Sequence, residues 1–231
     1  MRQNQAMSRL NVFGPPAEWP DQDLIAFSSM MDPALVLDAY RSGVFPMPLE
    51  HSGFERTGWW SPVRRGVLPL DSLVVSRSLR KSAKHFTTTI DTAFDEVVER
   101  CGDPDRPYGW IDASIREVYG HLHRTGFAHS VETRDATGRL VGGLYGLSLG
   151  GLFAGESMFH DEQNGRDASK VALMRLVELL SDDYADARLI DTQWLTPHLA
   201  SLGVLEIDRS EYLDLLDELL AVPEPTWPSN A

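Results

Sequence analysis

Three β-prone segments follow one another in the second half of the chain, with only short turns between them. They span residues 129–133, 140–149 and 152–159, and the joining stretches are Asp135-Ala136-Thr137-Gly138 and Gly150-Gly151. Turn-forming residues between apolar strands are typical of hairpins, so this pattern predicts an antiparallel meander. The meander constrains the fold more than any other feature, because it supplies the central strands on which flanking helices pack.

Apolar residues at helical or alternating spacing predict further elements on both sides of this meander. They are a strand at 87–90, helices at 92–100, 113–124 and 168–180, a strand at 188–194 and a last helix capped by Ser210. Helices and strands in this order predict an α+β domain with a mixed central sheet. The order is compatible with a GNAT-like (acetyltransferase-like) fold, although the pattern alone does not prove it.

The beginning of the chain differs in character and predicts a small N-terminal lobe. A helix is expected to begin after Asp32, with Pro33 in its first position, and to end at Gly43. The two prolines of Phe45-Pro46-Met47-Pro48 remove backbone donors, so we expect a rigid extended loop there. The predicted organisation is an N-terminal lobe at 1–62, a larger domain at 63–222 and a flexible tail at 223–231.

Composition limits the compartments and partners that the chain can have. With 231 residues, 42% of them hydrophobic, it is long enough to bury a core. No run approaches the roughly 18 consecutive apolar residues of a membrane span, and residues 1–10 lack the apolar core of a secretory signal. The single cysteine, Cys101, excludes an intramolecular disulfide and a cysteine-rich metal cluster. It continues a helical apolar row, so we expect a core thiol in a cytoplasmic protein.

The charges are distributed unevenly along the chain. A formal net charge of −13 argues, taken alone, against nucleic acid as a partner. Residues 54–84, however, hold seven basic residues and two acidic ones, whereas residues 156–220 hold fifteen acidic residues and five basic ones. The short basic run fits a solvated surface as well as a phosphate-binding one, so both interpretations stay open at this point.

A carboxylate interrupts an apolar strand at Gly155-Glu156-Ser157-Met158-Phe159. With two-residue periodicity, Glu156 would share its face of the sheet with Leu152, Ala154 and Met158. A carboxylate among apolar neighbours is costly unless it is paired or faces a cleft. Glu156 could therefore bind a cationic ligand or act as a base, or it could be an edge-strand glutamate in solvent.

A second polar pair lies in the apolar strand that ends near residue 194. Asp191 and Gln193 are two residues apart, so alternation places them on one face, with Ile190 and Thr192 on the other. Glutamine both donates and accepts hydrogen bonds, which suits the orientation of an amine or a carbonyl. The alternative is a structural hydrogen-bonded pair.

Other common functional motifs are missing or stand in the wrong context. There is no GxxxxGK[ST] phosphate loop, and the GxSxG match at residues 146–150 runs into the Gly150-Gly151 turn of a predicted hairpin and not into a helix, so it is not a nucleophile elbow. The glycine pairs at 142–143 and 150–151 lie in a hairpin, so they do not cradle a dinucleotide. His121 and His123 do not share a helix face and make a poor metal pair.

The motifs, taken in order, resemble those of the bacterial leucyl/phenylalanyl-tRNA–protein transferases over about residues 24–216. The matching segments are Ala39-Tyr40-Arg41, Gly43-Val44-Phe45-Pro46, Trp59-Trp60-Ser61-Pro62, Ser76-Arg77-Ser78-Leu79-Arg80, Trp110-Ile111, Ala128-His129-Ser130-Val131-Glu132, Leu140-Val141-Gly142-Gly143-Leu144-Tyr145-Gly146, Gly155-Glu156-Ser157-Met158-Phe159, Ala168-Ser169-Lys170, Ile190-Asp191-Thr192-Gln193 and Ser201-Leu202-Gly203. So many matches in one order make a chance similarity implausible.

This resemblance implies transfer of Leu, Phe or Met from aminoacyl-tRNA to proteins with N-terminal Arg or Lys, which creates a degradation signal. It implies a monomer with a GNAT-like C-terminal domain, a smaller N-terminal domain and no metal or nucleotide cofactor. Glu156 would attract the cationic acceptor, and Asp191 with Gln193 would be the catalytic pair that assists the α-amine. The implied aminoacyl pocket consists of Met47, Trp110, Leu144, Phe153 and Met158. The implied tRNA-binding residues are Arg77, Arg80, Lys81 and Lys84.

The chain also departs from the family pattern, and rival functions follow from its fold class. Met47 stands where the family usually has tryptophan, so the preferred amino acid is open. A conventional acyl-CoA N-acetyltransferase on the same fold is the main alternative. It would need a pyrophosphate-binding loop before the helix at 168, where this chain has Asn164-Gly165-Arg166-Asp167 and a carboxylate that would repel pyrophosphate. A catalytically silent RNA-binding protein is the second alternative.

Overall fold

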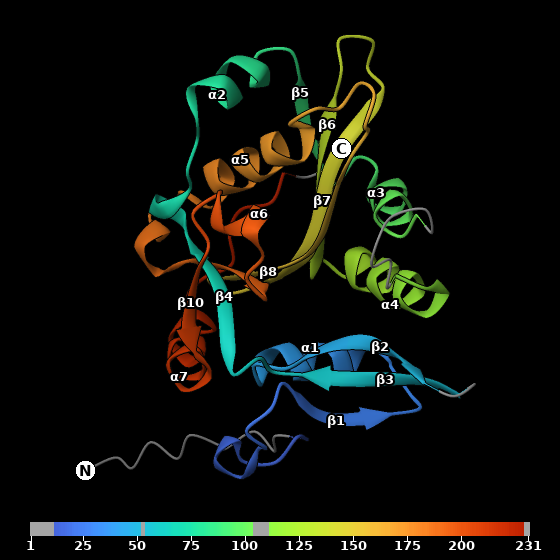
Figure 1. Ribbon diagram of the computed structural model, residues 1–231, viewed down its shortest axis with the longest axis vertical. Coiled ribbons are helices and arrows are strands. Elements are labelled where there is room, and N and C mark those ends of the chain that lie inside the picture. The colour runs from blue at the N-terminus through green and yellow to red at the C-terminus, as the bar shows by residue number, and fades with distance from the viewer. Residues whose placement is uncertain (1–11, 52–53, 104–110, 229–231) are drawn as a thin grey trace.

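The computed structural model describes residues 12–51, 54–103 and 111–228 of the chain (Figure 1). In chain order its elements are η1 (Pro16–Glu18), β1 (Leu24–Ser28), α1 (Pro33–Arg41), β2 (Phe45–His51), β3 (Phe54–Trp60), β4 (Arg64–Pro69), η2 (Leu70–Ser72), α2 (Arg77–Ala83), β5 (Thr87–Ile90), α3 (Phe94–Cys101), α4 (Ala113–Arg124), β6 (Ala128–Arg134), β7 (Leu140–Leu149), β8 (Leu152–His160), α5 (Ala168–Leu180), η3 (Ala185–Ala187), β9 (Leu189–Gln193), α6 (Pro197–Ala200), β10 (Leu205–Asp208) and α7 (Arg209–Leu219).

The larger sheet has the strand order β10-β4-β9-β8-β7-β6-β5. Its neighbouring strands are antiparallel except for β8 and β9, which are parallel. Helices α3 and α4 cover one face and α5 covers the other (Figure 1). The predicted α+β class with a mixed central sheet is therefore confirmed, and the meander forms β6, β7 and β8.

The smaller sheet has the order β1-β3-β2 and belongs to the N-terminal part of the chain. The side chain of Asp32 accepts a hydrogen bond from the Leu35 N–H and begins α1, as predicted. The segment predicted to be an extended loop is instead the start of β2, which pairs with β3. Its extended backbone was expected, and its prolines are tolerated because β2 is an edge strand.

The two sheets share one hydrophobic core. Val36, Tyr40 and Trp59 from the N-terminal part pack in the same buried cluster as Tyr119 and Tyr145 from the larger sheet and its helices. Ordering the N-terminal part against the rest of the chain therefore buries apolar surface of both, which stabilises their relative position. The N-terminal part can thus contribute side chains to a site on the larger sheet.

Two predictions near the C-terminus are wrong. The last helix begins at Arg209 after Asp208, so Ser210 lies inside its first turn and is not its cap. The segment after it, predicted as a flexible tail, packs against the sheet as far as the structure describes it. Glu224 accepts hydrogen bonds from Ser148 Oγ (2.8 Å) and the Gly150 N–H (2.6 Å). Trp227 stacks on His129 with ring centroids 3.8 Å apart.

None of the helices that the structure describes combines the length and the hydropathy needed to span a bilayer.

Candidate functional site

A cavity of about 140 Å³ lies between the strands around β8 and helix α5. Its wall is mainly apolar, and its polar members are Tyr145, Glu156, Ser157, Thr192 and Gln193. An apolar cavity of about 150 Å³ is large enough to bind benzene. The cavity can therefore hold a side chain of the size of phenylalanine or leucine beside a few polar groups, which is typical of a small-ligand site.

Glu156 reaches this cavity because β8 contains a bulge. Tyr145 on β7 pairs with Ser157, and the next residue, Gly146, pairs with Gly155, so Glu156 is an extra residue without a partner in the ladder. A bulge reverses the alternation of the strand beyond it. Met158 accordingly packs toward the α5 face, away from the tyrosines that contact Glu156, so the prediction that these two residues share a face is wrong.

Two tyrosines hold the carboxylate of Glu156. Tyr40 on α1 donates to Oε1 over 2.5 Å, and Tyr119 on α4 donates to Oε2 over 3.0 Å. Their hydroxyls are also 2.8 Å apart. Both tyrosines lie among the buried, mainly apolar residues of their helices, and nothing local in the sequence shows that their hydroxyls meet a carboxylate 116 and 37 residues away.

The surroundings of Glu156 favour its neutral form. The pKa of Glu156 is raised to about 8, chiefly by burial and also by the nearby Asp191 carboxylate, although the hydrogen bonds from Tyr40 and Tyr119 and the charge of Arg65 act to lower it. Burial likewise keeps the pKa of both tyrosines well above 10, so they act as donors. A carboxyl group in a cavity with a pKa close to neutral pH is a candidate for binding a cation, because the cation would favour its ionised form.

The raised pKa predicts a pH-dependent effect of Glu156→Gln on stability. Between about pH 4.5 and pH 8 the unfolded chain loses the Glu156 proton while the folded protein keeps it, so wild-type stability falls as the pH rises. Glutamine has no such titration. We expect the stability of the variant relative to wild type to rise by at most about 1.4 kcal/mol per pH unit over this window and to become constant above pH 8.

Urea denaturation at several pH values measures this difference. Glu162→Gln is the matched control, because it makes the same replacement at a glutamate that is exposed in the loop after β8. If the stability difference between Glu156→Gln and the wild type does not change with pH, the pKa of Glu156 is not raised.

Asp191 is completely buried and pairs with Arg65. Arg65 Nε donates to Oδ1 over 2.8 Å and Nη2 to Oδ2 over 2.6 Å, and Tyr212 donates its hydroxyl to Oδ2 over 3.1 Å. The guanidinium also donates to the Gly43 carbonyl over 3.0 Å. Arg65 was counted in the basic run of the sequence, but only 1% of its side chain is exposed, so it is not available to a surface partner.

Gln193 has a strained backbone and a free amide. Its φ is +59°, in the left-handed region that non-glycine residues avoid, and its N–H donates to Asp191 Oδ1 over 2.9 Å. Its Nε2 is buried in the cavity wall, and no hydrogen-bond partner for it lies among the described residues. Strain of about 1–3 kcal/mol and an unpaired buried donor are typical of functional sites.

The prediction that Asp191 and Gln193 lie on the same face of the sheet is wrong. The β4–β9 ladder pairs Val67 with Asp191 and Gly66 with Gln193, so it skips Thr192. This second bulge brings Thr192 and Gln193 to the cavity together, while Asp191 lies behind them and does not line it. Within the described part of the chain, Thr192 Oγ1 is also buried without a partner.

The other residues expected at the aminoacyl pocket are placed unevenly. Leu144, Phe153 and Met158 line the cavity. Met47 is half-buried in β2 and is not part of the lining, and Trp110 lies outside the described residues. The predicted tRNA-binding cations lie together and exposed on or just after α2; they are Arg77, Arg80, Lys81 and Lys84. Across the described residues, no group of three or more His, Cys, Asp or Glu side chains is arranged to hold a metal ion.

Comparison with known proteins identifies the family of this chain. The leucyl/phenylalanyl-tRNA protein transferase family matches residues 67–217, and the N-terminal domain of the same family matches residues 29–63. Relatives with the name leucyl/phenylalanyl-tRNA–protein transferase occur in Rhizorhabdus wittichii, with 48% identity over 83% of this chain and 76% of the relative, and in Gluconobacter oxydans, with 45% identity over 86% of each. The relative in Rhodospirillum rubrum is 48% identical over 82% of this chain and 88% of its own length. Among solved structures, FemX matches 64% of this chain and 60% of its own with a TM-score of 0.46 and 9% identity. The chain belongs to the leucyl/phenylalanyl-tRNA–protein transferase family.

Proposed function

We propose that this protein transfers leucine, phenylalanine or methionine from aminoacyl-tRNA to the α-amine of proteins that begin with Arg or Lys, which marks them for degradation. The carrying observation is that Glu156 and the free amide of Gln193 meet at one apolar cavity. The cavity would hold the side chain of the transferred amino acid, with Leu144, Phe153 and Met158 in its wall. Glu156 would attract the cationic N-terminal residue of the acceptor.

The chemistry needs few catalytic groups, because an aminoacyl ester is already activated. The α-amine attacks the ester carbonyl, a C–N bond forms, the C–O bond to the tRNA ribose breaks, and the ribose hydroxyl leaves with a proton that the amine gives up. The amide of Gln193 would hold the amine and the carbonyl in register, so that attack is effectively intramolecular. Asp191 accepts a hydrogen bond from the backbone N–H of Gln193, and through it would fix the position from which the side-chain amide reaches the substrate.

We further infer a GNAT-like catalytic domain at residues 63–222, completed by an N-terminal lobe at 1–62 that supplies Tyr40. The parallel β8–β9 pair within an otherwise antiparallel sheet supports this fold. We propose that the protein works as a monomer in the cytoplasm, where charged tRNA and newly exposed N-termini meet, and that it needs no metal or nucleotide cofactor.

Transfer of radiolabelled Leu, Phe and Met to peptides that begin with Arg, Lys, Asp or Glu tests this proposal. Label should reach the basic peptides only, and Glu156→Gln should raise their KM, because it removes the charge that meets the cationic side chain. Acceptance of acidic N-termini would overturn the role of Glu156. Micromolar binding of acetyl-CoA without any transfer of label would instead favour an acyl-CoA N-acetyltransferase.

The size of the cavity predicts a change in amino-acid preference for Leu173→Phe. Leu173 lines the cavity, and a larger side chain there would reduce the space of about 140 Å³. We expect the ratio of kcat/KM for Phe to that for Leu to fall by about tenfold, because phenylalanine fills more of the space. Single-turnover assays with each aminoacyl-tRNA measure this ratio. Leu179→Phe, on the same helix but outside the lining, is the control, and an equal loss for both amino acids in Leu173→Phe would show that the cavity does not hold the side chain.

A further inference from the structure

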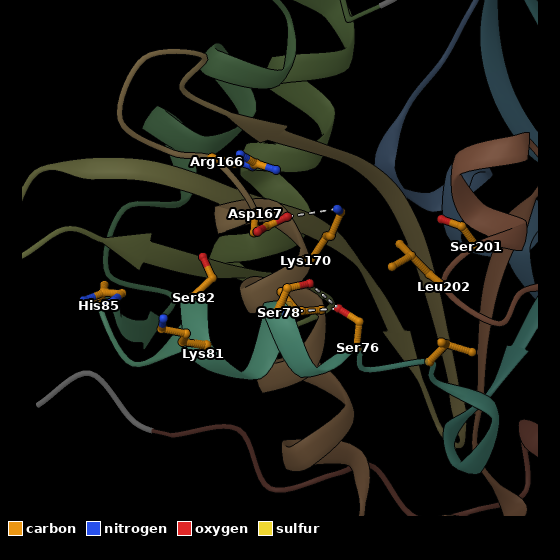
Figure 2. A pocket seen from close by; sticks show the side chains of 12 residues that line it. Ser76, Ser78, Lys81, Ser82, His85, Arg166, Asp167, Lys170, Ser201 and Leu202 are labelled. Atoms are coloured by element: carbon orange, nitrogen blue, oxygen red, sulfur yellow. Dashed lines mark hydrogen bonds and ion pairs between the residues drawn. The ribbon is translucent and has the colours of Figure 1, made fainter.

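A second hollow, a groove of about 620 Å³, lies between α2 and the beginning of α5. Figure 2 shows Lys81 and His85 on the α2 side and Arg166 and Lys170 on the α5 side. Serine hydroxyls on the α2 side and that of Ser201 after α6 complete the lining, and Asp167 supplies the one carboxylate among the lining residues. In a chain with a net charge of −13, a groove with three permanent cations and several hydroxyl donors is suited to a phosphate group.

Lys170 and Asp167 form an ion pair inside this groove. Lys170 Nζ lies 2.9 Å from Asp167 Oδ1, and the two side chains are 32% and 19% exposed (Figure 2). Asp167 is the N-cap of α5, but its side chain makes no capping hydrogen bond, because its carboxylate is turned toward Lys170. The positive end of the α5 dipole therefore adds to the field of the cations in the groove.

The groove and the cavity share two walls. Lys170 lines the groove and Leu173 lines the cavity, about 4.5 Å further along the axis of α5. In the second shared wall, Ser201 and Leu202 after α6 line the groove, while Leu199 within α6 and Val204 line the cavity. If the aminoacylated end of a tRNA strand reaches the cavity, the phosphate backbone of that strand lies close to the groove.

We propose that this groove binds a backbone phosphate of the tRNA strand that delivers the amino acid, and that Asp167 competes with this phosphate for Lys170. The proposal rests on the proposed function, and it adds Arg166 and Lys170 to the cations of α2. In the free protein the ion pair occupies Lys170. In the complex the lysine contacts the phosphate, while the carboxylate of Asp167 stays close and weakens binding. A built-in competitor of this kind would help the discharged tRNA to dissociate after transfer.

The competition predicts opposite effects of two substitutions on the affinity for uncharged tRNA. Lys170→Gln should weaken binding by about five- to tenfold and lower the slope of log affinity against log salt by about 0.7–0.9, because one phosphate contact is lost. Asp167→Asn should tighten binding by about threefold, because the competing charge is removed while asparagine tolerates the φ of +70° at this position. Fluorescence anisotropy over a salt series measures both effects.

Arg175→Gln is the matched control. It removes one positive charge from the same helix, but Arg175 pairs with Glu178 and does not line the groove. If Lys170→Gln and Asp167→Asn both have the same affinity for tRNA as this control variant, the subsite does not exist. Thermal melting of each variant verifies that it is folded.

Calorimetric titration with inorganic pyrophosphate separates the two possible sources of the phosphate. If pyrophosphate binds at micromolar concentration in a Lys170-dependent way while tRNA affinity is unchanged in the variants, the groove serves a small molecule and the tRNA assignment is wrong. If the wild type transfers no label to Arg-peptides, yet the two substitutions shift tRNA affinity in opposite directions, the proposed function fails and the subsite stands.

Discussion

Gln193→Ala is expected to lower kcat/KM for transfer to an Arg-peptide by about 10²–10³-fold, which is the usual loss when a pre-organised hydrogen-bonding group is removed. The amide of Gln193 is buried in the cavity wall with its Nε2 unpaired among the described residues, so it is available to a substrate group. The loss should appear in kcat, because the amide is proposed to position the reacting amine and carbonyl and not to bind the acceptor side chain. Steady-state transfer of labelled leucine measures it.

Gln193→Gly separates the role of the amide from the role of the backbone. With φ at +59°, alanine at this position is strained, whereas glycine adopts that conformation readily. We expect the glycine variant to be more stable than the alanine variant and equally inactive. If transfer survives in either variant while the protein stays folded, the amide has no part in the reaction.

The sequence predicted the strands of the central sheet because their pattern is local. Alternating apolar residues and turn residues predict β6, β7 and β8 without any knowledge of their partners. The two bulges could not be predicted in this way, because a bulge is defined by the register of the neighbouring strand. Both bulges lie at the site, where they bring Glu156 and Gln193 to the cavity. Simple alternation therefore predicted which residues are unusual, but not which of them face one another.

The partners of the site residues were also beyond the reach of local patterns. Tyr40 lies among the apolar residues of a helix and Arg65 lies in a basic run, so the local sequence shows no carboxylate partner for either. The structure places the first on Glu156 and the second on Asp191, which is 126 residues further along the chain. Family resemblance identified Glu156, Asp191 and Gln193 as a group, since motif matching does not depend on knowing the contacts.

The pair formed by Arg65 and Asp191 predicts a large loss of stability when only one partner is removed. In Asp191→Asn the buried guanidinium would lose its counter-charge, so we expect the free energy of unfolding to fall by about 3–5 kcal/mol. Replacing both residues, as Arg65→Met with Asp191→Leu, should cost less than the sum of the single losses, because no unpaired charge stays in the core. Urea denaturation of Arg65→Met, Asp191→Leu and the double variant gives the coupling energy, and Asp191→Asn is measured beside them.

The chain contains a control for this prediction in the pair formed by Arg188 and Asp182. Its geometry is nearly the same, with Nε–Oδ1 at 2.9 Å, Nη2–Oδ2 at 2.6 Å and a third guanidinium bond to the carbonyl of Gly150 at 3.0 Å. Asp182, however, is 34% exposed, whereas Asp191 is not exposed at all. The Arg188 side chain is as buried as that of Arg65, but water reaches the Asp182 carboxylate, so Asp182→Asn should cost less than Asp191→Asn. Equal losses at the two sites would mean that burial of the carboxylate does not decide the strength of the Arg65–Asp191 pair.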